Sequence, residues 1–230
     1  MMGCNMTTRK PFRCAALAAA ALVMAVPAFA AGGHFAVDDA SLLEPGQCGA
    51  ESWIGRDTGG DRSLHAGAAC RVGAFELGAA GEHVRGGGSE TRWNLEAKWA
   101  RALSERFAIG FDVQPARQAH ARPHYEGTSL AALATWRPRS ELAVHANLGR
   151  DLLRGAPDQP RAGIAVEWSP GGPWTWTGER YLEEESHFVR AGVRWQAGEA
   201  WSIDFSRAQR LAGPAASNWT LGVNVEFGRP

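Results

Sequence analysis

The segment from Thr91 to Gln114 alternates apolar and polar side chains in two arms, and this period of two constrains the fold more than any other feature. The apolar positions are Trp93, Leu95, Ala97 and Trp99 in the first arm, and Phe107, Ile109, Phe111 and Val113 in the second. Successive side chains of a β-strand point to opposite faces, so the pattern indicates strands with one apolar face. Folding the segment about Leu103 pairs Trp99 with Phe107, and the apolar side chains of the two arms then lie opposite one another on the same face. The segment therefore predicts a β-hairpin.

Alternating segments of the same kind recur from Gln47 to Phe227 and predict about 12 strands (roughly 10–12). The segment Trp174–Tyr181 alternates least clearly among them. Some of the stretches between strands, such as Ala116–Gly127, are predicted to be long loops. The predicted fold is all-β: an antiparallel up-and-down β-barrel over residues 47–227, which follows an N-terminal lead-in without periodicity over residues 31–46.

The N-terminus has the three parts of a secretory signal peptide. Arg9, Lys10 and Arg13 supply positive charge, and residues 15–26 form an apolar stretch that is too short to span a membrane as a helix. An A-x-A site then ends at Ala30. We therefore expect residues 1–30 to be a signal peptide that is cleaved near Ala30 on export.

Two cysteines follow the predicted signal peptide, Cys48 and Cys70. Folding the chain about Gly59 places them opposite one another on two neighbouring strands. An oxidising compartment permits a disulfide there, provided that the geometry fits. The alternatives are two unpaired small apolar residues, or a metal site, although no second pair of ligands accompanies these cysteines. We predict the disulfide.

Alternation alone does not tell whether the apolar face covers a core or faces lipid. A soluble periplasmic barrel of the lipocalin kind would alternate equally well. The connections, however, alternate between short turns and longer loops, and short turns at one end are typical of outer-membrane barrels. The lengths of the connections therefore favour a transmembrane barrel.

Aromatic side chains gather at the strand ends next to the short turns. A membrane interface favours aromatic residues at one level, whereas a soluble core has no reason to place them there. The predicted aromatic girdle consists of Trp99, Phe107, Trp136, Trp168, Trp174, Trp195, Trp201 and Phe227.

The polar faces of the strands carry charges of both signs, interleaved with glycine, which suits a crowded and hydrated lumen. Solvated charges on the outside of a soluble barrel are the alternative. The candidate pore-lining residues are Arg92, Glu96, Lys98, Asp112, Arg190, Arg194 and Asp204.

Composition and motifs narrow the classes of function. The chain has 24 Lys and Arg against 24 Asp and Glu, and the predicted signal peptide removes three of the basic residues. The remainder is close to neutral, so nucleic acid is not predicted as a partner. The fingerprints of common hydrolases and nucleotide-binding folds are absent from the sequence. We therefore predict no catalytic residue, no cofactor, no metal site and no enzyme.

Two stretches resemble known outer-membrane proteins of Gram-negative bacteria. The last strand ends on Phe227, which is similar to the aromatic-terminated signal that the barrel-insertion machinery recognises, although Gly228-Arg229-Pro230 follow it. The residues His34–Ala40, Gly46-Gln47 and Glu51-Ser52-Trp53 resemble the start of barrels in the phenol meta-degradation pathway transport-like family. That resemblance implies passage of small solutes, hydrophobic or aromatic ones in particular.

We therefore predict a transmembrane barrel of the cell outer membrane, with outer-membrane lipid and the insertion machinery as partners. Its predicted role is that of a narrow channel or binding protein for small solutes, with a charged lumen. A soluble periplasmic lipocalin-like barrel that binds an apolar ligand is one alternative. A plugged barrel with a purely structural role is the other, because paired charges would also close a lumen.

Overall fold

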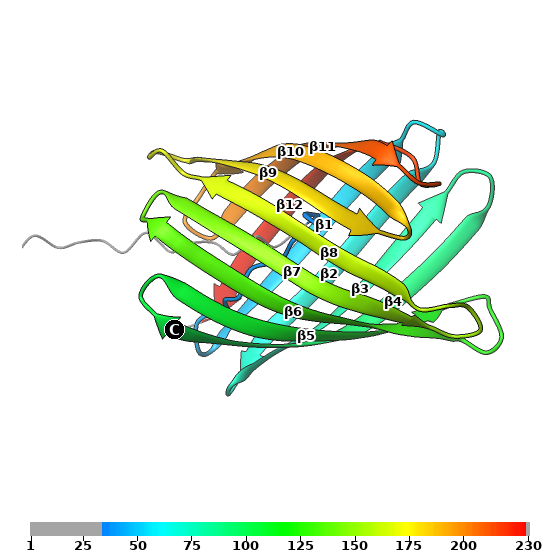
Figure 1. The fold of residues 1–230 in the computed structure, drawn as a ribbon, viewed down its shortest axis with the longest axis horizontal. Coiled ribbons are helices and arrows are strands. Elements are labelled where there is room, and N and C mark those ends of the chain that lie inside the picture. The colour runs from blue at the N-terminus through cyan, green and yellow to red at the C-terminus, as the bar shows by residue number, and fades with distance from the viewer. Residues whose placement is uncertain (1–33, 229–230) are drawn as a thin grey trace, which may run out of the picture.

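Twelve antiparallel strands form a closed barrel in which each strand pairs with its neighbours in sequence and β1 pairs with β12 (Figure 1). The computed structural model describes residues 34–228. The strands are β1 (Gln47–Asp57), β2 (Arg62–Val72), β3 (Phe75–Arg85), β4 (Ser89–Ser104), β5 (Phe107–Gln118), β6 (Tyr125–Arg139), β7 (Leu142–Leu153), β8 (Gln159–Trp168), β9 (Trp174–Glu183), β10 (Ser186–Gln196), β11 (Trp201–Ala212) and β12 (Asn218–Gly228). The predicted all-β up-and-down barrel is confirmed, as is the weakly alternating strand β9. The predicted signal peptide lies outside the described residues.

The hairpin of β4 and β5 confirms the predicted pair of strands but corrects its register. Trp99 lies opposite Phe111, and β4 continues to Ser104 before the chain turns. The predicted partner Phe107 instead lies opposite Ser104, beyond an irregularity in the ladder. The pairing differs by four residues, an even number, so every side chain keeps its predicted face.

The predicted long loops are also wrong, because the strands extend into them. β5 ends only at Gln118 and β6 already begins at Tyr125, which leaves a short connection where a long one is expected. Outside a membrane, the ends of barrel strands meet water on both faces. The alternation of apolar and polar side chains is lost there, although the backbone hydrogen bonds between the strands continue. Side-chain periodicity therefore does not detect these strand ends.

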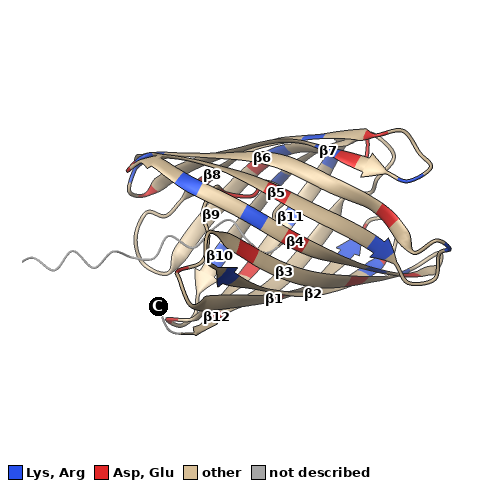
Figure 2. Ribbon diagram, turned by 90° about the horizontal axis from the view of Figure 1, so that it is seen from below, with Lys and Arg blue, Asp and Glu red and all other residues tan. Residues whose placement is uncertain are grey.

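The barrel turns its apolar side chains outward and its polar ones inward. Exposed large side chains include Leu148, Ile164 and Leu221, whereas Lys98 and Asp204 are buried. Charged residues occur along the strands and not only at their ends (Figure 2). This is the reverse of a soluble barrel, in which the apolar face fills the interior. No helix among residues 34–228 is long and apolar enough to cross a membrane.

Cys48 and Cys70 form the predicted disulfide between β1 and β2, with an S–S distance of 2.04 Å. The two residues are direct partners in the ladder, so the predicted pairing about Gly59 is confirmed. The bond closes a loop with a sequence separation of 22 residues.

Replacing both cysteines with Ser is expected to lower the free energy of unfolding by about 3 kcal/mol, because the unfolded chain regains the entropy of the closed loop. The barrel should still form, since the ladder holds β1 and β2 together. Urea titration of the barrel in lipid vesicles, read by gel mobility without heating, measures the change. A reductant should lower the midpoint of the wild type to that of the variant and leave the variant unchanged. A variant midpoint equal to that of the oxidised wild type would contradict the prediction.

Candidate functional site: a lumen crossed by the N-terminal segment

Residues 34–43, here called the lumenal segment, run inside the barrel before β1 begins (Figure 1). Val37, Asp39 and Ala40 are at most 2% exposed. The contacts of the whole segment reach from β3 and β4 on one wall to β9, β10 and β11 on the other. The segment therefore crosses the lumen and does not line one side of it.

Glu179 of β9 holds the first part of the lumenal segment through its backbone. Its two carboxylate oxygens accept hydrogen bonds from the amides of Ala36 and Val37, at 3.2 and 3.0 Å. Arg190 of β10 lies 3.1 Å from the same carboxylate and donates to the carbonyl oxygen of His34. Two buried charges thus neutralise each other and satisfy three backbone groups that water does not reach.

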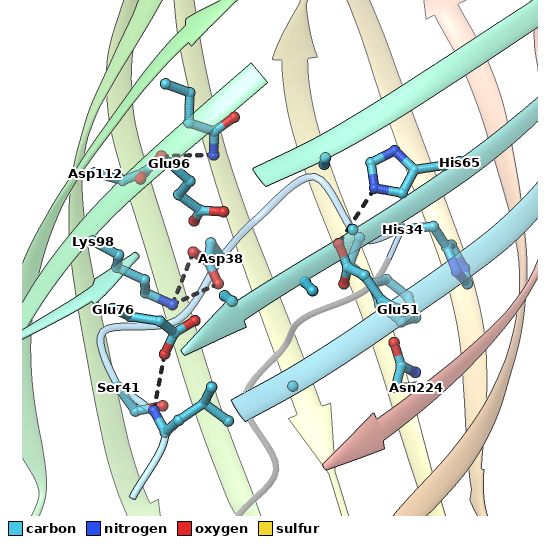
Figure 3. Close-up of a pocket in the computed structure, with 18 of the residues that line it drawn as sticks. His34, Asp38, Ser41, Glu51, His65, Glu76, Glu96, Lys98, Asp112 and Asn224 are labelled. Carbon is cyan, nitrogen blue, oxygen red and sulfur yellow. Dashed lines mark hydrogen bonds and ion pairs between the residues drawn. The ribbon is translucent and has the colours of Figure 1, made fainter. Parts of the chain in front are cut away.

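Lys98 of β4 holds the middle of the segment through charge. Its Nζ lies 2.9 Å from Asp38 Oδ2 (Figure 3). The same atom lies 3.1 Å from Asp39 Oδ1. Asp39 is fully buried and Lys98 nearly so. Burial of these charges costs free energy unless they pair, so the three residues depend on one another.

A chain of hydrogen bonds anchors Ala40. Its amide donates to Thr135 Oγ1 at 2.8 Å, the Thr135 hydroxyl lies 2.9 Å from His145 Nδ1, and His145 Nε2 lies 3.3 Å from Glu167. A hydroxyl, an imidazole and a carboxylate in this order resemble a catalytic triad. Thr135 is completely buried and its hydroxyl contacts the lumenal segment. The arrangement therefore holds the segment and does not present a nucleophile to a solute.

Glycines on the strands provide room for the apolar side chains of the segment. A Cβ atom at Gly163 of β8 would lie 2.5 Å from Val37 Cγ2, and one at Gly192 of β10 would lie 2.9 Å from the ring of Phe35. Val37 also packs in a small buried cluster with Tyr181 and other residues of β8 to β11. The glycines of the inward face thus match the shape of the segment.

The structure brings most of the predicted pore-lining residues into the lumen. Arg194 forms hydrogen bonds of 2.6 and 2.9 Å with Asp204 on the next strand, and Arg190 and Lys98 contact the lumenal segment. Glu96 and Asp112 line the open part of the lumen.

Arg92 lies apart from the others, at the rim formed by the loops. It pairs with Glu90 at 2.7 Å and with Glu126 at 3.2 Å, and it is half exposed. Glu184, in the turn between β9 and β10, approaches the same guanidinium at 3.9 Å. Burial and the neighbouring Glu183 raise the pKa of Glu184. Arg92 therefore belongs to a cluster of charges at the mouth of the barrel.

A cavity of about 870 Å³ remains beside the lumenal segment (Figure 3). One of its walls comes from β1 to β5 and carries Glu51, Glu76, Glu96 and Asp112. Trp53 also faces the cavity and stacks on His65, with 3.4 Å between the ring centroids. Among residues 34–228, no three His, Cys, Asp or Glu side chains are close enough together to hold a metal ion. The cavity is thus a polar space of small-molecule size.

The residues of the predicted girdle lie on the outer surface of the barrel. Phe107, Trp136, Trp168, Trp174, Trp195, Trp201 and Phe227 are between 39% and 51% exposed, and Trp99 is half-buried. All but Trp99 and Trp136 stand at or next to the end of a strand that faces a connecting turn or a chain terminus.

Sequence reasoning missed the residues that hold the lumenal segment, above all Asp38, Asp39 and Glu179. The stretch before β1 has no periodicity, and periodicity is the signal on which the prediction of elements depends. A weak signal did exist. Two adjacent carboxylates follow Val37 in a stretch whose only other charged residue is Glu44, and the chain after the signal peptide contains a single lysine, Lys98.

A closed barrel with an apolar outer face and a charged lumen defines the class of the protein: it is an outer-membrane β-barrel. The chain belongs to the family described as "Uncharacterised conserved protein UCP029691", whose model matches residues 19–227. No curated protein matches the sequence.

Several solved structures are similar to this barrel. The KdgM porin has a TM-score of 0.64 at 9% sequence identity, and the match covers 78% of this chain and 99% of that one. The NanC porin has a TM-score of 0.60 at 8% identity, covering 77% of this chain and all of that one. The toluene transporter TbuX of Ralstonia pickettii has a TM-score of 0.46 at 11% identity, covering 80% and 89%. The likeness to the two porins confirms the predicted fold, that of an outer-membrane barrel.

Proposed function

We propose that the protein is a narrow outer-membrane channel for small solutes, constricted by its own lumenal segment. The observation that carries the proposal is the cavity of about 870 Å³ that persists beside the segment and is lined by charged side chains. A barrel with a purely structural role has no need of such a polar space. A barrel of about 12 strands lies in size between small filled barrels and open porins.

In this proposal Glu96, Lys98, Asp112, Arg190, Arg194 and Asp204 line or shape the pore, and Arg92 lies at its outer mouth. The similar KdgM porin has been solved in complex with disordered oligogalacturonate, which supports passage of hydrophilic solutes through a barrel of this size. The Thr135 hydroxyl is buried under the lumenal segment, and this supports transport over catalysis.

The girdle defines how the barrel sits in the outer membrane. We place the lipid interface of the periplasmic side at the level of Trp136, Trp168 and Trp201, because amphipathic rings favour that level. Gln47 and Gly228, at the two ends of the barrel sequence, are partners in the ladder and would both face the periplasm. Cleavage near Ala30, contact with lipid and recognition of the Phe227 strand by the insertion machinery belong to the same proposal.

The purified barrel is expected to form small, long-lived conductance steps in planar bilayers, because solvent fills the space beside the segment. The native protein should also fractionate with detergent-extractable outer membrane and run faster on gels before heating. A folded barrel without any conductance would contradict the channel and favour a plugged one. Release with the periplasmic fraction would contradict the membrane location.

A further inference from the structure

The two walls of the lumen differ in charge. On the wall of β8 to β11 the charges are paired: Arg190 with Glu179, and Arg194 with Asp204. On the wall of β1 to β5, several carboxylates line the cavity, namely Glu51, Glu76, Glu82, Glu96 and Asp112. The buried arginines of the first wall are therefore balanced by carboxylates, whereas carboxylates predominate on the second wall.

The cations near the acidic wall are engaged elsewhere. Lys98 binds Asp38 and Asp39 of the lumenal segment. Arg71, at the periplasmic end of β2, donates to the carbonyl oxygens of Gly73 and Leu43. His65 contacts Glu51 at 3.5 Å. No ion pair within 4.0 Å joins any of these cations to Glu96 or Asp112 among residues 34–228.

One carboxylate oxygen of Asp112 is buried without a hydrogen-bond partner in the described part of the chain. The residue is 6% exposed, and its Oδ2 accepts a hydrogen bond from Gln114 at 2.8 Å. Its Oδ1 is buried and has no hydrogen-bond partner among the described residues. A buried carboxylate oxygen left unpaired costs free energy, and in native proteins such a group often has a functional explanation.

Glu96 lies on the same wall and faces open space. The carboxylates of Asp112, Asp38 and Glu76 repel it, and Lys98 is the positive charge that acts against them, so a second positive charge in the cavity would reduce this repulsion. The Glu96 carboxylate lies over Gly78 of the neighbouring strand β3, where a Cβ atom would be 3.4 Å from Oε2. Figure 3 shows Glu96 and Asp112 together at one side of the cavity, beyond the Lys98–Asp38 pair.

We propose that Glu96 and Asp112 form a binding site for the cationic group of an organic amine in transit. The inference rests on the proposed channel, and it names the class of solute that the channel takes. Three ligating side chains do not converge among residues 34–228, so an ammonium group, which needs only hydrogen-bond acceptors and negative charge, fits better than a metal ion. Solutes with several carboxylates, such as oligogalacturonate, would be repelled by the same wall.

Calorimetric titration of the refolded barrel in detergent tests the site directly. The triamine spermidine is the cationic probe, trigalacturonate is the anionic one and maltotriose is the neutral one. Spermidine is expected to bind, and the other two are not. The double variant Glu96→Gln with Asp112→Asn should weaken spermidine binding at least about tenfold, since two charged acceptors are lost. The control Glu141→Gln, on the exposed turn between β6 and β7, should leave binding unchanged.

Reversal potentials across a bilayer with a KCl gradient give a second readout. The wild-type channel should prefer potassium over chloride, and the double variant should lose most of that preference. Gel mobility before heating tests whether each variant is folded. If the double variant does not fold, Asp112→Asn alone is used, and a smaller loss of spermidine binding and of potassium preference is expected.

Equal binding of spermidine to the wild type and the variant would overturn the site, as would equal binding of trigalacturonate and spermidine. Absence of conductance, by contrast, would contradict the channel while the calorimetric result still decides the binding site. The two failures are therefore distinguishable.

Discussion

Removal of residues 34–43 is expected to raise the single-channel conductance of the barrel several-fold. The segment crosses the lumen, and Val37, Asp39 and Ala40 are almost completely buried within it. Conduction through a pore depends on its narrowest section, and water would occupy the volume that the segment leaves. The barrel itself should persist, because the segment contributes no pair to the closed ladder of twelve strands.

Planar-bilayer recordings of the deletion variant measure this effect directly. The matched control replaces residues 34–43 with a Gly/Ser sequence of the same length, which keeps the chain but removes its anchors. Both variants should conduct better than the wild type. Unchanged conductance in the deletion variant would show that the constriction lies elsewhere, and closure of both variants would favour a barrel filled by its own strand side chains.

Replacement of Lys98 with Met is expected to release the lumenal segment while the strands remain paired. The substitution keeps the length of the side chain but leaves Asp38 and Asp39 without their cation. An uncompensated buried charge costs about 3–5 kcal/mol. The segment can instead leave the lumen, where water hydrates its carboxylates. The substitution therefore cannot cost more stability than the free energy of docking the segment.

The conductance of Lys98→Met should therefore approach that of the deletion variant. Two combinations make the test specific. Asp38→Asn with Asp39→Asn in the Lys98→Met background should restore part of the closed state, because neutral amides tolerate burial better than charges. In the deletion background Lys98→Met should change conductance little, since its partners are gone. A wild-type conductance for Lys98→Met would show that the charge pair does not hold the segment.

The strands were predictable because each one alternates apolar and polar residues within its own sequence. The apolar positions Leu95 and Ile109 sit on the outward face whether or not the register between their strands is right, since an even shift preserves the face. The Cys48–Cys70 pair was predictable for a similar reason: the turn between β1 and β2 is short and regular, so counting from its centre gives the correct partners. The register of the β4–β5 hairpin was not, because β4 continues through Leu103 and an irregularity shifts the pairing.

The candidate site was predictable only in part. Lys98, Arg190 and Arg194 stand on inward faces, which alternation identifies. Their partners lie on other strands or on the lumenal segment, and no local pattern links Lys98 to Asp38, which is 60 residues away in the sequence. Alternation places Arg92 on the inward face as well, but it lies at the mouth of the barrel because it stands near the start of β4.

The sequence by itself determined the number of strands to within about two, the face of most side chains and the opposition of Cys48 and Cys70, because these depend on a period of two and on short turns. The tertiary structure alone decided what fills the lumen. Closure of β1 onto β12 brings Lys98, Thr135 and Glu179 from three separate strands around one non-periodic segment. A stretch without periodicity finds its place only through such distant partners, so its position in the barrel emerges only when the strands are assembled.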